Sequence, residues 1–310
     1  MSDVALPDDR TAAFLDAERN GVADDEVAAR GSVRQRLLLI GRALVKQPSL
    51  VVSILLLATV ALAALFPEIF TSFNPIRGHG GARLKPPSFE HLMGTDHMGR
   101  DLYARVIYGT RESLQAVVLA VSVGMVVGCG VGLVAGYVGR WVDDMLMRLV
   151  DVLLAVPMLL ISLAIINALG FGMVNIAIAV GIGSIAGFAR VTRSQVLKIR
   201  AAAYIEATLF AGVGRTRVLL RHIIPNALGP VVVLATLELG WSILSVSALS
   251  FLGFGPPPPT PEWGQLVAAG RDYMSAAWWL TALPGLVIVF TVLAANRVAQ
   301  ELAGREVAGS

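Results

Sequence analysis

Long runs without Asp, Glu, Lys or Arg alternate with polar segments along this chain of 310 residues. A helix that crosses the hydrocarbon core of a membrane needs about 20 mostly apolar residues. Four runs suit one helix each, and a fifth run, residues 152–189, is long enough for two helices joined by the turn Gly170-Phe171-Gly172. The pattern predicts an all-α membrane protein with six transmembrane helices, at about residues 49–66, 114–139, 148–169, 173–190, 229–253 and 276–297.

The positive residues between these runs predict the orientation of the spans. Lys and Arg in short loops are held on the cytoplasmic side of a membrane. With the N-terminus inside, 18 of the 25 Lys and Arg residues fall on the cytoplasmic side. We therefore expect both termini in the cytoplasm, with segments 67–113 and 254–275 outside and the segment 191–228 inside.

The N-terminal residues differ in composition from the rest of the chain. Residues 1–30 contain eight acids and three arginines but few large apolar side chains, too few to offset the entropy of ordering. We expect residues 1–33 to be a flexible cytoplasmic tail and residues 34–310 to form the transmembrane domain. Residues 34–46 mix basic and apolar positions, which suits either a helix lying on the inner leaflet or a simple extension of the first span.

The composition excludes several classes of function. Hydrophobic residues make up 55% of the chain and charged residues 15%, which is too apolar for an ordinary soluble enzyme. The formal charge of +3 does not indicate nucleic-acid binding, because the basic residues line the inner membrane face. The chain contains no Gly-Lys dipeptide and therefore no phosphate-binding loop of the G-x-x-x-x-G-K-[ST] kind. We expect a non-catalytic membrane protein that binds no cofactor and takes no energy from ATP by itself.

The cytoplasmic segment 191–228 is too long and too basic for a simple turn. Strong helix formers at residues 201–211 precede Gly212-Val213-Gly214, and a second short stretch ends at Pro225-Asn226. A single acid, Glu206, lies among the basic residues. Two short helices joined by a glycine turn form a structure that can dock into a groove of a cytoplasmic partner, although a loop that merely sits at the lipid headgroups has the same composition.

This segment resembles the "EAA" loop of bacterial ABC-importer permease subunits. The glycine follows the glutamate by six residues and the proline follows the glycine by thirteen, as in that family, whereas the second alanine of the motif is replaced by threonine. The resemblance implies that the first short helix is a coupling helix, which seats in a cleft of the ATP-binding subunit. The residues that match the motif are Glu206, Ala207, Thr208, Gly212, Pro225 and Asn226.

Two further motifs are similar to the C-type subunit of the dipeptide/oligopeptide/nickel branch of that family. The first lies before the second span and resembles the signature "GTD..GRD....R.IYG.R.SL"; its residues are Gly94, Thr95, Asp96, Gly99, Arg100, Asp101 and Arg111. The second, at residues 250–264, resembles "SFLG.G...P.P.WG" and contains Gly253 and Trp263. We expect Gly94-Thr95-Asp96 to make a turn and a helix cap, and Arg100, Asp101, Arg105 and Arg111 to form local pairs at the outer mouth.

The resemblance implies a type I ABC importer permease fold in a bacterial plasma (inner) membrane. It also implies a function: inward movement of peptides or similar small solutes, driven by ATP and Mg²⁺ on partner subunits. The implied partners are a homologous permease subunit in a heterodimer, two ATP-binding subunits, an extracytoplasmic substrate-binding protein and the lipid bilayer. Two alternatives stay open: an autonomous secondary transporter or channel and, within the family, an importer of nickel or another non-peptide substrate.

Three features within or near the predicted spans have more than one interpretation. Glu238 is an ionisable group at membrane depth, which indicates a transport pathway or a subunit interface, or else a local pair with a basic residue such as Arg221. Glycines at 124, 128, 132 and 136 predict close packing against another helix, of this chain or of a second subunit. Histidines at 79, 91 and 97 do not have the spacing of a recognised metal-ligand set, so we expect no metal site.

Overall fold

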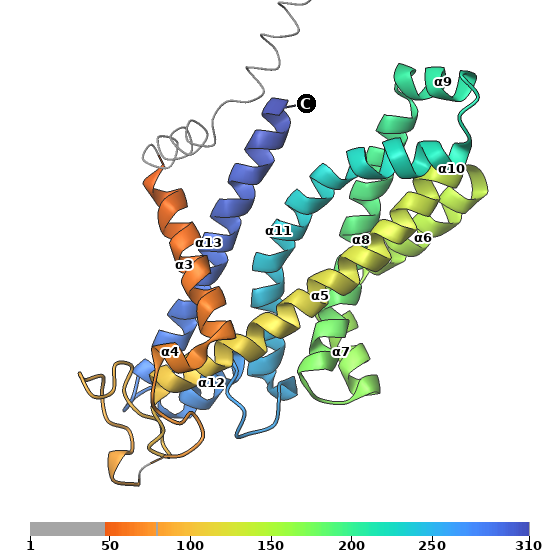
Figure 1. The fold of residues 1–310 in the computed structure, drawn as a ribbon. Coiled ribbons are helices and arrows are strands. Elements are labelled where there is room, and N and C mark those ends of the chain that lie inside the picture. The colour runs from red at the N-terminus through yellow and green to blue at the C-terminus, as the bar shows by residue number, and fades with distance from the viewer. Residues whose placement is uncertain (1–46, 79, 310) are drawn as a thin grey trace, which may run out of the picture. The chain divides into compact units, whose positions relative to one another are not determined.

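The computed structural model describes residues 47–78 and 80–309 of the chain, so the predictions for residues 1–33 and 34–46 lie outside the described residues. Nearly all described residues belong to one compact unit, Val52–Ser310. They form helices and no β-strand (Figure 1). The α-helices are α3 (Pro48–Leu65), α4 (Pro67–Phe70), α5 (Leu102–Val138), α6 (Arg140–Ala155), α7 (Met158–Leu169), α8 (Met173–Arg200), α9 (Ala203–Phe210), α10 (Arg215–Val218), α11 (Ile224–Leu249), α12 (Trp263–Gly270) and α13 (Trp279–Gly309). Short turns of 3₁₀-helix (Gly80–Ala82 and Arg271–Tyr273) and of π-helix (Leu219–Ile223 and Ser250–Phe254) connect some of them.

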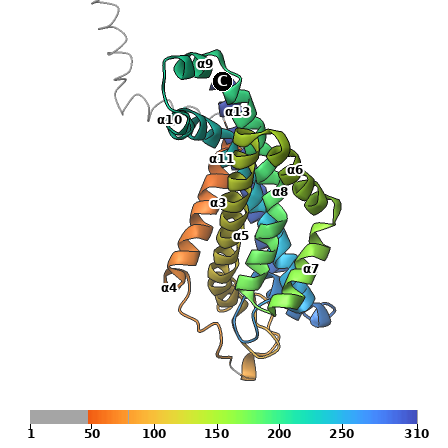
Figure 2. The same ribbon diagram turned by 90° about the vertical axis from the view of Figure 1, so that its right-hand side faces the viewer.

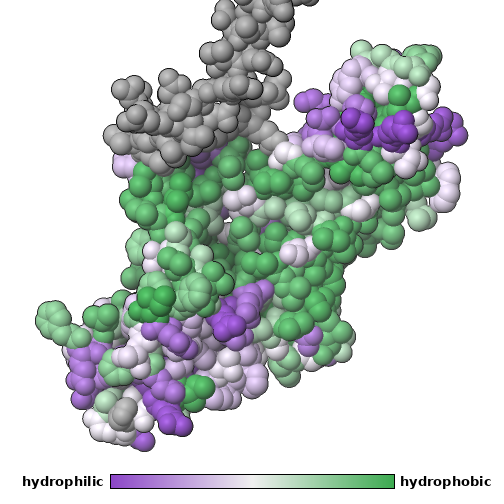
Figure 3. Space-filling view, viewed as in Figure 1, coloured by the Kyte–Doolittle hydropathy of each residue, from purple (hydrophilic) through white to green (hydrophobic). Residues whose placement is uncertain are grey.

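Five helices are long and apolar enough to cross a membrane, and a sixth crossing is present if the bent pair α6 and α7 counts as one span. The five are Pro48–Leu65, Leu102–Val138, Met173–Arg200, Arg215–Phe254 and Trp279–Gly304. Figure 3 shows a hydrophobic surface over the middle of the visible face, with hydrophilic residues over the loop before α5 and around α10. This distribution confirms the predicted all-α membrane protein.

The third predicted span, residues 148–169, corresponds to a bent pair of helices, α6 and α7. The axes of α6 and α7 differ by 94°, and the break falls at Val156 and Pro157. Val156 has extended backbone angles, φ −94° and ψ 130°. The ring of a proline disfavours helical angles at the residue before it, so Pro157 ends α6 inside the apolar run.

The second predicted span, residues 114–139, begins earlier than expected. Helix α5 starts at Leu102 because Asp101 caps it: the Asp101 carboxylate accepts a hydrogen bond from the Ala104 backbone N–H at 2.7 Å. Its 37 residues are about 55 Å long at 1.5 Å per residue. This length exceeds the ~30 Å hydrocarbon core, so part of the helix projects beyond it.

The glycine stripe of α5 packs against α8 of the same chain (Figure 2). This confirms the predicted close helix packing and shows that the partner helix belongs to this chain. A Cβ atom at Gly128 would lie 2.6 Å from the Ile185 carbonyl oxygen, and one at Gly124 would lie 2.9 Å from the Ser184 Cβ. Lipid offers no hydrophobic drive for helix association, so close backbone contact of this kind supplies the stabilisation. The two helices therefore form a tightly packed pair at the centre of the unit.

We expect Gly132→Ala to lower the stability of this helix pair. Its new Cβ would overlap the Ala189 carbonyl oxygen, a backbone atom, so α5 and α8 must separate. Overpacking of this kind costs about 1–3 kcal/mol. Thermal unfolding of the purified protein in detergent measures the effect. The matched control is Gly130→Ala, whose Cβ meets nothing within 4 Å; equal melting temperatures for the two variants would contradict the packing account.

Candidate functional site

The first candidate site is a helical knuckle, residues 203–223, which joins α8 to α11 at one end of the unit (Figures 1 and 2). Ile205 of α9 is 2% exposed and packs in a cluster with Val196 of α8 and Val218 of α10. The other side of α9 is exposed: Glu206, Ala207 and Phe210 have no cover, and Phe210 is 91% exposed. One buried anchor thus holds a short helix whose opposite face is free.

The turn after α9 depends on backbone conformation. Gly212 has φ +82°, a left-handed angle that L side chains rarely adopt, although a Cβ there would meet nothing within 4 Å. Within α9, the Thr208 hydroxyl donates to the Tyr204 carbonyl oxygen at 2.7 Å. The hydroxyl that replaces the second alanine of the motif therefore bonds within its own helix and does not disturb the exposed face.

Pro225 does not end the helical segment, contrary to the sequence prediction. The π-turn Leu219–Ile223 continues directly into α11, and Pro225 lies in the first turn of that helix. A proline is tolerated there because the first N–H groups of a helix have no partner within it. The side chain of Asn226 donates to the His222 carbonyl oxygen at 2.7 Å and to the Tyr204 hydroxyl at 3.4 Å, which links α11 to α9.

Hydrogen bonds connect the knuckle and the end of α8 to α5. The Tyr137 hydroxyl donates to the Arg215 carbonyl oxygen at 3.0 Å. The Arg200 guanidinium, at the end of α8, donates to the carbonyl oxygens of Gly136 and Tyr137 at 2.7 and 2.8 Å. These carbonyl groups at the C-terminal end of α5 have no partner within the helix, and Arg200 supplies one. One hydrogen bond thus joins the knuckle to α5, and two more join the C-terminal end of α8 to the same end of α5.

Between α8 and α6, Arg193 and Asp143 form a bidentate pair with N–O distances of 2.5 and 2.6 Å. Bidentate pairs fix orientation as well as distance. The pair therefore fixes α8, the helix that leads into the knuckle, against α6.

The second candidate site is the signature that begins at Gly94, whose first residues form a buried clasp at the start of α5. Asp96 accepts from the side chain of Arg100 at 2.6 Å and from the backbone N–H groups of Met98 and Arg100 at 2.8 and 3.0 Å. Arg105 approaches the same carboxylate at 3.8 Å and donates to the Pro75 carbonyl oxygen. The three charged side chains are all at most 8% exposed.

Asp101 holds the other half of this clasp. It caps α5 through one oxygen, while its second oxygen lies 2.8 Å from Nδ1 of the buried His91. Gly94 and Gly99 have φ +77° and +76°, as the turns around Asp96 require. Thr95 donates to the Ala82 carbonyl oxygen, and Trp279 of α13 donates to the Thr95 carbonyl oxygen at 3.4 Å.

This geometry corrects two of the sequence predictions. The turn at Gly94-Thr95-Asp96 forms, but Asp101 is the helix cap. Arg100, Asp101 and Arg105 form local pairs, whereas Arg111 does not: it is exposed, and it has no ion pair or hydrogen bond with any residue that the structure describes.

The segment after α11 supplies a residue that sequence reasoning missed. Glu262 is fully buried; it accepts from the hydroxyl of Ser113 at 2.9 Å, from the Ser250 hydroxyl and from the Gln265 backbone N–H at 2.9 Å. Its neighbour Trp263 is also fully buried and donates to the Val106 carbonyl oxygen at 3.2 Å. The signal available in the sequence was an acid directly before the tryptophan of the "WG" motif.

The remaining predicted residues have structural partners. Gly253 has φ +95° and turns the chain at the end of the π-helical segment. Glu238 of α11 is half-buried and accepts from the Ser184 hydroxyl of α8 at 2.9 Å; it forms no pair with Arg221. Within residues 47–78 and 80–309, no group of three His, Cys, Asp or Glu side chains is arranged to hold a metal ion.

Comparison with known proteins identifies the family. Residues 128–303 match the family described as binding-protein-dependent transport system inner membrane component. The chain is 38% identical over 252 residues to the dipeptide transport system permease protein DppC of Alkalihalophilus pseudofirmus, covering 81% of this chain and 83% of that protein. It is 39% identical over 249 residues to the di/tripeptide transport system permease protein DppC of Pseudomonas aeruginosa, covering 78% of this chain and 82% of that protein.

Two solved structures share the fold. An inward-facing methionine ABC transporter, MetNI, matches with a TM-score of 0.50 at 17% identity, over 64% of this chain and 96% of that chain. An amino acid ABC transporter solved with histidines matches with a TM-score of 0.51 at 17% identity, over 65% of this chain and 94% of that chain. The predicted type I importer permease fold is thereby confirmed. The chain belongs to the family of binding-protein-dependent inner membrane components, as an ABC-importer permease subunit of the dipeptide/oligopeptide/nickel type.

Proposed function

We propose that this chain is the permease subunit that moves peptides inward through a bacterial plasma membrane, driven by separate ATPase subunits that dock on the knuckle. The proposal combines the family with the geometry of α9. The permease family is non-catalytic, and its ATP hydrolysis occurs on other subunits. ATP and Mg²⁺ therefore belong to those subunits and not to this chain.

The observation that carries the docking proposal is the exposed face of α9. Phe210 is 91% exposed, and the Glu206 carboxylate is exposed one turn before it on the helix. Aromatic side chains are enriched at the centres of protein interfaces. A cleft that takes this helix would bury Phe210 and offer a basic or hydrogen-bonding group to Glu206, whereas the surrounding knuckle surface is basic.

The mechanism follows from the contacts of the knuckle. When two ATPase subunits close around ATP, the docked α9 moves with them. The motion would reach the membrane helices through the bond of Tyr137 on α5 to Arg215 of α10, the bonds of Arg200 at the end of α8 to α5, and the Arg193–Asp143 pair between α8 and α6. The bound ATPase and the loaded binding protein each favour one of two arrangements of the same helices, so their effects are coupled and reciprocal.

The further partners are a homologous permease subunit, which completes the transport path as a heterodimer, and an extracytoplasmic substrate-binding protein. Helix α3 presents many large apolar side chains, among them Leu55 at 61% and Leu62 at 49% exposed, which suits lipid or a second membrane subunit. The excess of basic residues on one side favours a cytoplasmic position for both termini and the knuckle. The clasp before α5 then lies at the outer face, where a binding protein delivers its load.

Two alternatives make different predictions. An autonomous secondary transporter or channel needs no docking helix and no partner subunit. An importer of nickel or another non-peptide substrate uses the same fold, and the dipeptide transport names belong to the relatives of this chain. Reconstitution with the ATPase, second permease and binding-protein subunits separates the substrate classes: we expect ATP-driven uptake of labelled dipeptides, and uptake of nickel without peptides would refute the substrate assignment.

A further inference from the structure

Arg111, near the N-terminal end of α5, has no counter-ion among residues 47–78 and 80–309. The nearby acids have other partners. Asp96 pairs with Arg100 and lies near Arg105, and Asp101 pairs with His91 and caps α5. Glu262 accepts hydrogen bonds from two serine hydroxyls. Glu112 adjoins Arg111 in sequence, but the two side chains form no ion pair in the part of the chain that the structure describes. Arg111 is therefore an exposed positive charge, without an ion pair in the described part of the chain, at the edge of an apolar run.

Two more polar side chains share this face of α5. Gln115 lies one turn after Arg111 and Ser122 two turns further, and all three are exposed. Positions spaced by four and seven residues fall on one side of a helix. The three residues cover about 16 Å along the axis, from the outer end of α5 into the predicted span. The glycine stripe of α5 is buried against α8, and it does not include these positions.

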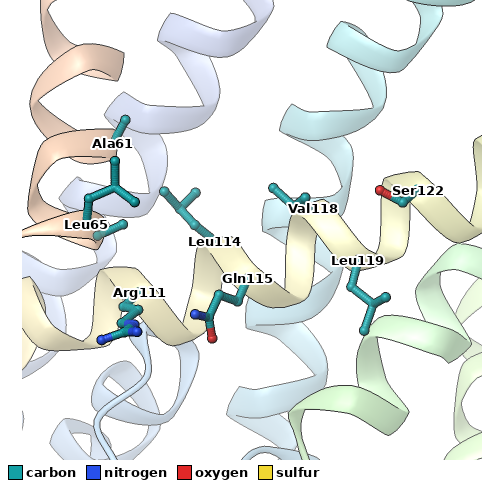
Figure 4. A pocket seen from close by; sticks show the side chains of 9 residues that line it. Ala61, Leu65, Arg111, Leu114, Gln115, Val118, Leu119 and Ser122 are labelled. Carbon is teal, nitrogen blue, oxygen red and sulfur yellow. The ribbon is translucent and has the colours of Figure 1, made fainter.

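The polar face borders a hollow of about 570 Å³ between α3 and α5, lined by Ala61, Leu65, Arg111, Leu114, Gln115 and Ser122 among others. Figure 4 shows Arg111 and Gln115 projecting from the same side of α5, with Ala61 and Leu65 on α3 nearby. The visible face of the molecule also has a hydrophilic patch over α5 within a hydrophobic surface (Figure 3). The volume is within the range of about 300–1,000 Å³ that is usual for small-molecule sites.

The chemistry of the hollow defines what it can bind. Its walls are mainly aliphatic and accept varied side chains, while a guanidinium binds a carboxylate through two parallel hydrogen bonds. The Gln115 amide both donates and accepts, as a peptide backbone requires. Arg111 lies just before the predicted span 114–139, where a long basic side chain reaches interfacial water and stays charged, so it is available to a passing anionic solute.

From this arrangement we infer that Arg111, Gln115 and Ser122 line the transport path, and that Arg111 binds the carboxylate of a peptide as it enters from the outer side. The inference rests on the proposed function, because it assumes that peptides are carried. It assigns this chain a substrate-binding role of its own, in addition to the selection made by a binding protein. The competing occupants of the same face are an acid of the second permease subunit and a lipid phosphate.

Charge-selective thiol labelling of the assembled importer tests this inference. Gln115→Cys is introduced into a Cys129→Ala background, and its reaction with an anionic and a cationic methanethiosulfonate reagent is compared in proteoliposomes. A positive charge in a narrow cleft attracts anions, so we expect the anionic reagent to react about tenfold faster. Arg111→Gln should remove this preference, and dialanine delivered by the binding protein should slow the reaction. Phe290→Cys on α13, 53% exposed, is the control position.

Uptake of dialanine by the same vesicles gives a second readout. We expect Arg111→Gln to lower uptake about tenfold or more, as for a lost charge-assisted hydrogen bond, and Arg111→Lys to restore part of it. Arg271→Gln should change nothing, because Arg271 is exposed and its ion pair among the described residues is with its neighbour Asp272.

The competing occupants predict different results. Loss of the second permease subunit from Arg111→Gln importers would overturn the inference, and so would protection of the Gln115→Cys thiol by phosphatidylglycerol but not by dialanine. Equal labelling rates for the two reagents would also overturn it. Failure of the proposed function is distinct from all of these, because it would appear as absent ATP-driven peptide uptake in vesicles with the unsubstituted chain.

Discussion

Glu206→Lys is expected to abolish ATP-driven uptake by the assembled importer. The carboxylate is exposed on the free face of α9, and the knuckle around it is otherwise basic. Reversing its charge places a cation where the ATPase cleft must supply a complementary group. Loss of a close charge pair at an interface costs about 2–5 kcal/mol, so the ATPase should bind at least about 30-fold more weakly. Co-purification of the ATPase with the tagged permease and uptake in proteoliposomes measure both effects.

Glu68→Lys is the matched control for this variant. Glu68 is also an exposed acid in the first turn of a short helix, α4, but it lies in the segment 67–113, which we expect on the outer side of the membrane, away from the ATPase. We expect normal co-purification and uptake from Glu68→Lys. Full ATPase binding by Glu206→Lys, or equal defects in the two variants, would disprove docking at α9. The melting temperature of both variants should stay close to that of the unsubstituted protein, since neither side chain is buried.

Asp96→Asn is expected to cause the largest loss of stability. The change removes the only carboxylate that faces Arg100 and Arg105 in the described structure, and it leaves two buried guanidinium groups without a counter-ion. Breaking a buried ion pair by removing one partner costs about 3–5 kcal/mol. The clasp also positions the Asp101 cap, so the start of α5 should loosen. Thermal unfolding in detergent and proteolysis of the segment before Leu102 are the measurements.

Asp151→Asn provides the comparison for that prediction. Asp151 pairs with Arg190 at 2.6 Å, but the two side chains are 60% and 55% exposed. Exposed pairs contribute little, because water screens them. A melting temperature for Asp96→Asn that is no lower than that of Asp151→Asn would show that the clasp does not stabilise the protein.

Much of the fold was predictable because the hydrophobic runs are long and the glycine positions are periodic. Apolar length predicts α3 and α13, and together with the turn at Gly170-Phe171-Gly172 it predicts α8; the spacing of Gly124 and Gly128 predicts a close helix contact. The start of α5 could not be read from charge-free length. It depends on the Asp101 cap and on a clasp of buried charged residues. Charged residues end an apolar run, so the length of that run places the start of the helix too late. The break at Pro157 was present in the sequence but lies within an apolar run.

The candidate sites differ in how far the sequence could predict them. The motif spacing predicts a helix, a turn and a second helix in the knuckle, and the structure adds the bond from Tyr137 that connects it to α5 and the bonds from Arg200 that connect the end of α8 to α5. Motif residues alone could not separate Arg100, which is buried and paired, from Arg111, which is exposed and has no ion pair among the described residues. Glu262 was missed because its partner Ser113 is 149 positions away in the chain.

The most direct test of the central claim is the flux through this chain by itself. Purified protein is reconstituted into vesicles with labelled dialanine, alongside vesicles that also contain the ATPase, second permease and binding-protein subunits. If the chain is a permease subunit that depends on its partners, we expect no flux above that of empty vesicles for the chain alone, and ATP-dependent accumulation for the complete assembly. Saturable dipeptide flux through the chain alone would contradict this expectation and favour an autonomous carrier.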